Sequence, residues 1–518
     1  MRADRSARCV VVVALVATAA LAVPGAARAS SAGGSRTVPA TDAARGLVYR
    51  DLRPAQAGGP CGLNRSMFEI VHDDKVLGCT HGPDTAPDRV DVRREVSTAA
   101  ITGSAPAQPT AVPCSGDGTS GNRVRVIYAV APDKPDRYSS VVTAIRQYAA
   151  EVNDVMMASA AETGGTRNVR WVTDGSCGLV VDHVVLPKST DDDSFGNTIT
   201  ALKAKSYTDP HRKYLIFEDA NLMCGVAEMY LDSKASSTNL NNGTADHGLF
   251  ARVDTGCWNT LPTGHNSAAH ELMHTLGAVQ SDAPHKTSYG HCVDEFDTMC
   301  YADGSPSIRM TYPCYFQHEA LMDCGHDDYF STNPPTGSYL ASHWNTAGSS
   351  FLDSTTGPWN DAFSKAASLA AAKGVAVGSN VSATKETGEP NTAGFTASRS
   401  VWWKIVPTSS QTLTVDTQQS SFDTVMGLYK GSSVSAVTLV ASNDNAGSGR
   451  TWSRVAVAVS SGVAYYLKVD GKSGTSGAIR LHVGNRARAA DRSVHLVWML
   501  VRRFHDGRRL RQRGVHVA

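Results

Sequence analysis

The chain has 518 residues, which is enough for two or three domains with separate cores. Its formal net charge is +1, but residues 485–518 hold nine arginines against two aspartates, and residues 30–484 are left with a net charge of −9. An acidic body excludes a nucleic-acid partner, because phosphate contacts need clustered lysine and arginine.

The amino-terminal residues have the pattern of an export signal. Three arginines precede an apolar run over 9–23, and the Ala-Arg-Ala sequence at 27–29 is a small-x-small cleavage site. The apolar run is too short for a comfortable membrane span, and no later segment of the body is long and apolar enough for one. We therefore expect a signal peptide over 1–29, a secreted, extracellular protein and no stable insertion into a membrane.

An even number of cysteines follows this signal. Removing Cys9 with it leaves ten, at positions 61, 79, 114, 177, 224, 257, 292, 300, 314 and 324. In an exported chain this number indicates up to five disulfides. The pairs Cys61–Cys79 and Cys314–Cys324 would close short loops and are the ones we predict, while the sequence leaves the remaining connectivity open.

Residues 30–120 are rich in Ala, Gly, Pro and Asp around one short cysteine-bracketed unit. We interpret them as a pro-region or accessory segment that precedes the first globular domain.

A regular α/β pattern starts near Gly121. Alternating apolar residues over 124–130 predict a strand, and an apolar stripe every three or four residues from Val141 to Val155 predicts a core-facing helix that ends at Gly164-Gly165. Further strands are expected over 169–172, 179–186 and 214–217, and a further helix from Asn266 or Ser267. This order predicts an α/β (α+β) domain over 121–350 with a twisted mixed sheet.

Residues 270–277 read His-Glu-Leu-Met-His-Thr-Leu-Gly and are the strongest functional signal in the chain. Two histidines four residues apart lie on one face of a helix, so both imidazoles can reach the same metal ion. Glu271 follows the first histidine, where its carboxylate lies beside the metal and can take a proton from water. Gly277 permits the left-handed residue with which many helices end. We predict an active-site helix with His270 and His274 as zinc ligands and Glu271 as general base.

The segment from His270 to Gly277 resembles the first part of the long motif of metzincin zinc endopeptidases, and residues 297–301 (Asp-Thr-Met-Cys-Tyr) resemble their methionine turn. The resemblance covers about 123–345. It implies that Met299 forms an apolar floor under the ligands and that Tyr301 hydrogen-bonds the oxyanion of the tetrahedral intermediate. The sequence departs from the family at Gln280, which stands where the motif has its third histidine.

A catalytic zinc site needs three protein ligands and a water molecule. His285 is our first choice for the third ligand, because it is of the right type and a slightly longer loop could return it to the metal. His291 is the second choice. The other candidates left open are Gln280, Asp282 and Glu295, the last of which suits a different class of zinc protease.

The mechanism that these residues imply is the activation of water. Zinc held by neutral imidazoles lowers the pKa of the water molecule bound to it to about 7. Glu271 accepts the proton as water attacks the peptide carbonyl and then delivers it to the leaving amine. Cys292 and Cys300 flank the methionine turn, and a disulfide between them would preorganise the site.

Carboxylate clusters also occur away from this motif. Residues 191–193 are three consecutive aspartates, and Asp323 precedes another pair at 327–328. Both are candidates for a structural Ca²⁺ site, although neither has the ligand spacing of a known calcium loop and solvated acidic loops are the commoner explanation.

Short alternating segments separated by turns follow residue 358. They lie over 401–405, 412–415, 424–429, 455–459 and 464–469 and predict an all-β sandwich over 358–484. Phrases such as Gly388-Glu389-Pro390-Asn391 and Ser421-Phe422-Asp423-Thr424 resemble the bacterial pre-peptidase C-terminal domain. Trp402 and Trp403 could present an aromatic binding surface, although a core position for one of them is the safer expectation. Residues 485–518 form a basic tail that we expect to be disordered.

Together these patterns indicate a secreted zinc metalloendopeptidase that acts on protein or peptide substrates as a monomer. The alternative is a non-catalytic adhesion or ligand-binding protein whose metal site is structural or vestigial. Glu271 distinguishes them, because a structural zinc site has no use for a base beside the metal.

Overall fold

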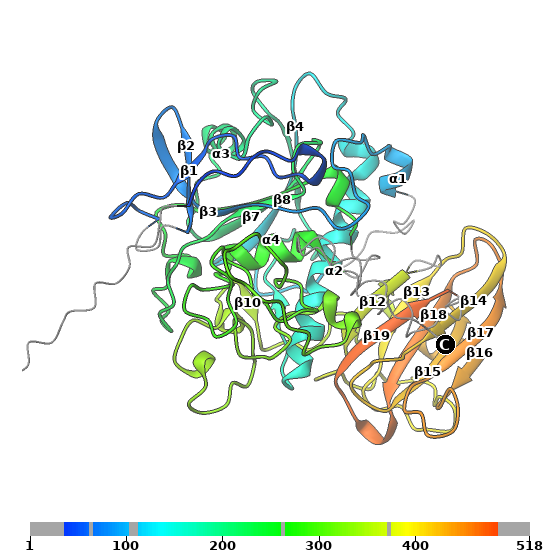
Figure 1. The fold of residues 1–518 in the computed structure, drawn as a ribbon. Coiled ribbons are helices and arrows are strands. Elements are labelled where there is room, and N and C mark those ends of the chain that lie inside the picture. Colours follow the sequence, from blue (N-terminus) through cyan, green and yellow to red (C-terminus); the bar gives the residue numbers. More distant parts are fainter. Residues whose placement is uncertain (1–35, 62–65, 103–111, 261–264, 370–373, 485–518) are drawn as a thin grey trace, which may run out of the picture. The chain divides into compact units, whose positions relative to one another are not determined.

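The computed structural model describes residues 36–61, 66–102, 112–260, 265–369 and 374–484, and the fold is mixed α/β with more strand than helix (Figure 1). The predicted signal peptide and basic tail lie outside the described residues. An eight-stranded sheet has the order β1-β2-β3-β8-β9-β7-β4-β6. Its strands are β1 (Leu52–Pro54), β2 (Phe68–His72), β3 (Lys75–Asp84), β4 (Arg123–Val130), β6 (Val181–Val185), β7 (Arg212–Glu218), β8 (Gly225–Glu228) and β9 (Leu249–Asp254).

One half of this sheet is parallel and the other half is antiparallel. Strands β6, β4, β7 and β9 pair in parallel, whereas β8, β3, β2 and β1 continue the sheet in antiparallel pairs. A mixed sheet is therefore observed, as predicted. Three of its strands come from the segment before residue 120, so that segment is part of the same sheet as β4.

Helices cover both faces of the parallel strands (Figure 1). The helices are α1 (Thr98–Thr102), α2 (Tyr138–Glu162), α3 (Phe195–Ala204) and α4 (Ser267–Thr275). Alternate residues of β4 explain the two layers: Val126 and Tyr128 share a core with α2 and α4, whereas Ile127 and Ala129 share a core with α3. Among the described helices, none has the length and apolarity that a membrane span would need.

The structure confirms β4, the helix α2 with its buried apolar stripe, and the start of α4 at Ser267. It also contains α3, β8 and β9, which the sequence pattern did not predict. The sequence of α3 mixes glycine, asparagine and three β-branched residues, which have low helix propensity, and burial of Phe195 and Ile199 compensates for it. Strand β8 has only four residues, too few for a recognisable alternation.

The chain after residue 366 forms a five-stranded sheet, β11-β13-β18-β15-β16, and a four-stranded sheet, β12-β19-β14-β17. Inward side chains of both sheets, such as Val401 and Leu481, belong to one apolar core. The strands are β11 (Ala367–Ser368), β12 (Gly374–Ser379), β13 (Val401–Ile405), β14 (Gln411–Asp416), β15 (Thr424–Gly431), β16 (Val437–Asn443), β17 (Arg454–Val459), β18 (Tyr465–Gly471) and β19 (Ala478–Val483). A further short pair joins β5 (Asn168–Val169) to β10 (Leu352–Asp353).

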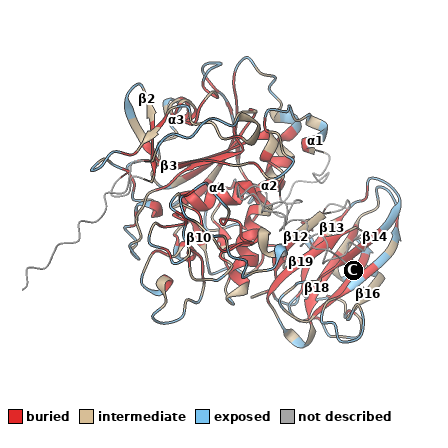
Figure 2. Ribbon diagram, viewed as in Figure 1, coloured by how far each residue is buried: buried red, intermediate tan, exposed pale blue. Residues whose placement is uncertain are grey.

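Neither tryptophan of β13 forms an exposed binding surface. Trp402 is 0% exposed and Trp403 is 2% exposed. Trp403 belongs to the core between the two sheets, and Trp402 packs with Phe363 and Tyr429 while its Nε1 donates to Glu389 at 2.9 Å. The aromatic surface suggested by the sequence is therefore absent at these two residues, because both sides of β13 are covered (Figure 2).

All ten cysteines that follow the predicted signal form disulfides. The predicted pairs Cys61–Cys79 and Cys314–Cys324 are present, and so is the pair Cys292–Cys300 beside the methionine turn. The other two bridges are Cys114–Cys177 and Cys224–Cys257. Disulfides in this number are typical of proteins that fold in an oxidising compartment.

The cap of α4 gives a testable stability difference. The side chain of Asn266 accepts a hydrogen bond from the Ala269 amide at 2.9 Å, satisfying one of the free N–H groups at the start of the helix. We expect Asn266→Ala to lower the free energy of unfolding by about 1 kcal/mol, measured by urea denaturation of chelator-treated protein. Asn266→Ser retains a capping oxygen and should lose less; equal losses for the two variants would contradict the capping role.

Candidate metal centre

Helix α4 presents His270, Glu271 and His274 inside the protein, where each is at most 1% exposed. The helix packs against β8 and β9 and ends at Thr275; Leu276 is its C-cap, and Gly277 follows with φ of +95°. A Cβ at Gly277 would lie 2.8 Å from side-chain nitrogens of Asn241 and Trp344. Both the left-handed conformation and this close packing require glycine, as the sequence predicted.

A third histidine joins the two on α4, and it is His291. The Nε2 atoms of His270 and His274 lie 3.0 Å apart, and the His291 ring centre is 5.4 Å and 5.1 Å from theirs. The ligand atoms of these three histidines, His81 and Asp84 all lie within 4.8 Å of one another. All five residues are buried, so they form one compact group that could hold a metal ion.

The outer nitrogen of each of the three imidazoles contacts an oxygen. Nδ1 of His270 lies 2.7 Å from the Thr298 carbonyl, and Nδ1 of His274 lies 2.8 Å from the Ala278 carbonyl. Nδ1 of His291 lies 3.1 Å from Oδ2 of Asp303. Each of these oxygens can accept a hydrogen bond from Nδ1–H, which leaves the Nε2 lone pair free to face the centre, as in histidine ligands of zinc sites.

The electrostatics of the centre favour a cation. The Nε2 atoms of His270 and His274 lie 3.0 Å apart, and with both protons on Nδ1 the repulsion between their lone pairs would be relieved by a cation next to them. Burial lowers the pKa of His274 well below its usual value, with further lowering from His81 and His270. Burial also lowers the pKa of His291, but Asp84 and Asp303 outweigh it and raise that pKa to about 9. Imidazoles and a nearby carboxylate fit zinc by ligand type, and zinc binding would displace the proton from His291.

The structure does not bring His285, the first choice for the third ligand, to the histidines of α4. Nδ1 of His285 lies 3.1 Å from Asp294, 3.4 Å from Asp328 and 3.6 Å from Asp327, and the side chain is 42% exposed. Residues 285–293 form a short hairpin in which Val293 N donates to the His285 carbonyl at 2.8 Å and Thr287 N donates to the His291 carbonyl at 2.7 Å. His291 is at the inner end of this hairpin, and the Cys292–Cys300 bridge ties that end to the methionine turn.

The remaining candidates for a third ligand also lie outside the group. Gln280 donates to the carbonyls of Tyr230 and Gly277, and Asp282 accepts a hydrogen bond from Tyr339 at 2.6 Å. Glu295 is buried but is not among the residues that meet at the centre.

Glu271 lies beside the centre and points to it from α4. Burial raises the pKa of Glu271 well above its usual value, and the nearby carboxylate of Asp84 raises it further. Its Oε2 has no hydrogen-bond partner among the described residues. A Cβ built at Gly225 would lie 1.9 Å from Oε1 of Glu271, so the glycine is what lets the first residue of β8 pass this carboxylate.

The methionine turn lies beside His270 and His291. Met299 is 0% exposed and shares a core with Leu272 and Met273 of α4. The ring centre of Tyr301 is 4.3 Å from that of His291, and the Tyr301 hydroxyl donates to Asp84. Tyr301 is therefore close enough to the centre for the role that the metzincin resemblance implies, but its hydroxyl is engaged by Asp84.

His81 and Asp84, at the end of β3, were missed by the sequence analysis. Oδ1 of Asp84 lies 3.0 Å from Nε2 of His291, and Oδ2 lies 3.3 Å from Nε2 of His270 and 2.8 Å from Nε2 of His81. Burial raises the pKa of Asp84, but the surrounding histidines outweigh it and hold the pKa well below its usual value. A histidine three residues before an aspartate is too common to be a signal, so only the pairing of β3 with β8 reveals them.

Of the two acidic clusters, 191–193 is divided among separate contacts. Asp192 pairs with Lys134, Asp193 pairs with Arg50 at 3.1 Å, and Asp191 accepts from the Lys188 amide at 2.8 Å. The other cluster contributes Asp327 and Asp328 to a group with His285 and Asp294 that could hold a metal ion. Asp323 instead accepts hydrogen bonds from backbone amides of residues 327–330 and organises that turn.

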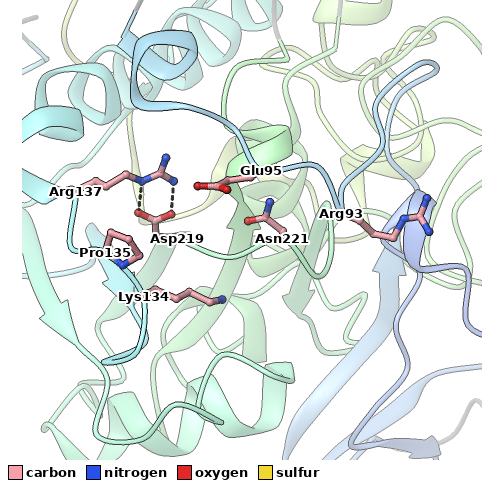
Figure 3. Close-up of a pocket in the computed structure, with 7 residues that line it drawn as sticks. All are labelled: Arg93, Glu95, Lys134, Pro135, Arg137, Asp219 and Asn221. Carbon is pink, nitrogen blue, oxygen red and sulfur yellow. Dashed lines mark hydrogen bonds and ion pairs between the residues drawn. The ribbon is translucent and has the colours of Figure 1, made fainter.

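A surface cavity of about 370 Å³ has no histidine in its lining (Figure 3). It is lined by Arg93, Glu95, Lys134, Pro135, Arg137, Asp219 and Asn221. Arg137 contacts Asp219 through two nitrogens, Lys134 pairs with Asp192, and Arg93 pairs with Asp91 at 2.9 Å. Because its cations are already paired, the cavity offers no unsatisfied charge to an anionic ligand.

Comparisons with known proteins find only remote similarity. No protein-family model matches the chain, and no curated protein matches it. The pre-peptidase C-terminal domain of a Bacillus anthracis collagenase is 13% identical over 23% of this chain and 92% of its own, with a TM-score of 0.16. The Aeromonas hydrophila lysozyme inhibitor PliG is 15% identical over 23% of this chain and 96% of its own, also with a TM-score of 0.16.

A longer match is OgpA from Akkermansia muciniphila, which is 10% identical over 74% of this chain and 96% of its own, with a TM-score of 0.20. A catalytically inactive form of OgpA, solved with an O-glycopeptide substrate, gives 9% identity and a TM-score of 0.19. Because these TM-scores are low, the function is inferred below from the geometry of the centre.

Proposed function

We propose that the protein is a secreted zinc-dependent endopeptidase whose metal is held by His270, His274 and His291. The observation that carries the proposal is the convergence of three buried Nε2 atoms on one point, with each outer nitrogen against an oxygen acceptor. When bound, zinc would supply Lewis-acid polarisation and make water acidic enough to ionise near neutral pH. The proposed catalytic domain is 121–350, with 358–484 as an accessory sandwich.

Glu271 has the position and the chemistry of a general base. It is the residue next to His270 on α4, it is buried, and its Oε2 has no hydrogen-bond partner in the described part of the chain. Its carboxylate takes the proton from the attacking water and returns it to the amine of the leaving peptide. A site that only stabilised the fold would not need an acid at this place, which is why a catalytic centre is favoured over the non-catalytic alternative.

Two further side chains would assist the reaction. Tyr301, once free of Asp84, has a hydroxyl in reach of the centre and would stabilise the negative oxygen that develops on the scissile carbonyl. Asp303 would hold His291 in one orientation, and Thr287 and Ser305 in turn donate hydrogen bonds to Asp303. Proteins or peptides are the proposed substrates, and a monomer is the proposed active form.

Metal removal tests this proposal directly. We expect about one zinc per chain by atomic emission, and casein cleavage that is abolished by 1,10-phenanthroline and restored by added zinc. Intact protein and protein partly digested with trypsin should both be assayed, with Glu271→Gln as the background for residual trypsin. The proposal fails if the chain binds no zinc, or if neither sample shows cleavage that depends on the chelator.

A further inference from the structure

A second group of metal-ligating side chains lies at the outer end of the hairpin that carries His291. It consists of His285, Asp294, Asp327 and Asp328, whose ligand atoms all lie within 4.8 Å of one another. His285 begins the hairpin and Asp294 directly follows it, whereas Asp327 and Asp328 belong to a separate turn. The proposed reaction uses none of these four residues.

The imidazole of this group is close to three carboxylates but hydrogen-bonded to none. Nδ1 of His285 lies 3.1 Å from Asp294, 3.4 Å from Asp328 and 3.6 Å from Asp327. It is nevertheless a buried atom without a hydrogen-bond partner in the described part of the chain, and so is Oδ1 of Asp327. The ligands of a tetrahedral zinc ion lie about 3.4 Å apart, because the bonds to nitrogen and oxygen are about 2.0–2.2 Å long. The group therefore has the spacing of ligands around one ion.

The negative charge of the group exceeds the positive charge beside it. Within the described ranges, the ion pairs of Asp294, Asp327 and Asp328 are all made with His285. One protonated imidazole would neutralise one carboxylate and leave two. The side chains of Asp294 and Asp328 are only 8% and 2% exposed. Because buried carboxylates without a counter-charge are costly, a divalent cation among them would stabilise the fold.

The ligand types favour zinc over calcium. Calcium takes about six to eight oxygen ligands, whereas the atom at the middle of this group is an imidazole nitrogen. Zinc binds imidazole and carboxylate together in four-coordinate sites. Asp323, which the sequence analysis placed with residues 327 and 328 as a possible calcium ligand, accepts hydrogen bonds from the amides of Tyr329 and Phe330 instead.

We propose that His285, Asp294, Asp327 and Asp328 bind a second zinc ion, which joins the outer end of the hairpin to the neighbouring turn. The His285 amide already links these two segments, because it donates to Oδ1 of Asp328 at 2.7 Å. The side chains of His285 and Asp327 are 42% and 41% exposed, so this zinc exchanges with solvent and is removed by dialysis against a weak chelator. The buried centre keeps its zinc under the same conditions. The inference does not depend on catalysis at that centre.

Calorimetric titration of zinc into the dialysed full chain tests this site. The zinc content of each protein is measured beforehand, so that only added metal is counted. We expect wild type to bind one further equivalent of zinc and to bind no Ca²⁺ at the same concentration. His285→Ala and Asp327→Asn should weaken this binding at least about 100-fold, because a ligand contributes more than an outer-shell partner. Circular dichroism checks the fold, which both substitutions should preserve because the two side chains are partly exposed.

His183→Ala is the matched control. Nε2 of His183 pairs with Asp136 at 2.7 Å, and these side chains are 38% and 41% exposed. Its imidazole is therefore about as exposed as that of His285, but it pairs with one carboxylate instead of three, and its removal should leave the further equivalent unchanged. Added zinc should also raise the unfolding midpoint of wild type and His183→Ala but not of His285→Ala, because an ion that binds only the folded chain stabilises it.

Two results would overturn the inference. If wild type binds no further zinc, or if His183→Ala loses as much binding as His285→Ala, these four residues do not form a specific site. If Ca²⁺ binds, and Asp327→Asn loses it while His285→Ala retains it, the aspartates form a calcium site and the zinc assignment is wrong. Neither result affects the zinc counted before the titration, so the proposed function is tested separately.

Discussion

Replacement of His291 by alanine should abolish zinc binding, whereas replacement of His285 should leave it intact. His291 contributes one of the three buried Nε2 atoms proposed to hold the metal, and its loss leaves only those of His270 and His274. The loss of affinity should exceed the roughly 10–100-fold that outer-shell partners of a metal ligand contribute. The measurement is zinc per chain after dialysis against a weak competing chelator, together with casein cleavage.

His285→Ala is the matched control, since it removes the same side chain from the same hairpin. His285 lies with three aspartates at a surface where it is 42% exposed, and it makes no contact with the histidines of α4. If His285→Ala lost its zinc while His291→Ala kept it, the ligand assignment drawn from the structure would be reversed. Equal loss in both variants would point to a collapse of the hairpin instead of the removal of a ligand.

Glu271→Gln should reduce casein cleavage by about 10²–10⁴-fold while zinc content remains near one per chain. Glutamine has nearly the same shape as glutamate but cannot take a proton from water. The centre retains its three histidines, so binding of the metal should not change. Cleavage is compared at equal zinc occupancy for wild type and variant after identical treatment with trypsin.

Zinc content decides what a loss of activity in this variant means. If Glu271→Gln lost zinc together with activity, Glu271 would be a ligand and the proposed mechanism would be wrong. Glu271→Asp is a useful companion, because it keeps an acid but withdraws it from the centre by one methylene group. It should retain zinc and recover part of the activity, provided that proton transfer is what the position supplies.

Several elements of the fold were predictable because their side chains show a clear period. The alternation in β4 and the three-to-four-residue stripe of α2 record which side of each element faces the core, and both are present where they were predicted. Helix α3 was not predictable from propensity, because tertiary burial of Phe195 overrides a poor local preference for helix. Strand β8 is defined only by its neighbours in the sheet.

Local sequence by itself determined the two histidines and the glutamate of α4, the glycine that follows the helix and the disulfides that close short loops. These residues are close in sequence and are connected by one helix or by a short loop. Their separation along the chain therefore determines how far apart they lie in the structure. Only the tertiary structure decided which later histidine reaches the centre, because a hairpin of nine residues presents His291 inward and His285 outward. The tertiary structure alone places Asp84 at the centre, because the pairing of β3 with β8 joins residues more than a hundred positions apart. No local pattern in the sequence encodes a contact between strands so distant in the chain.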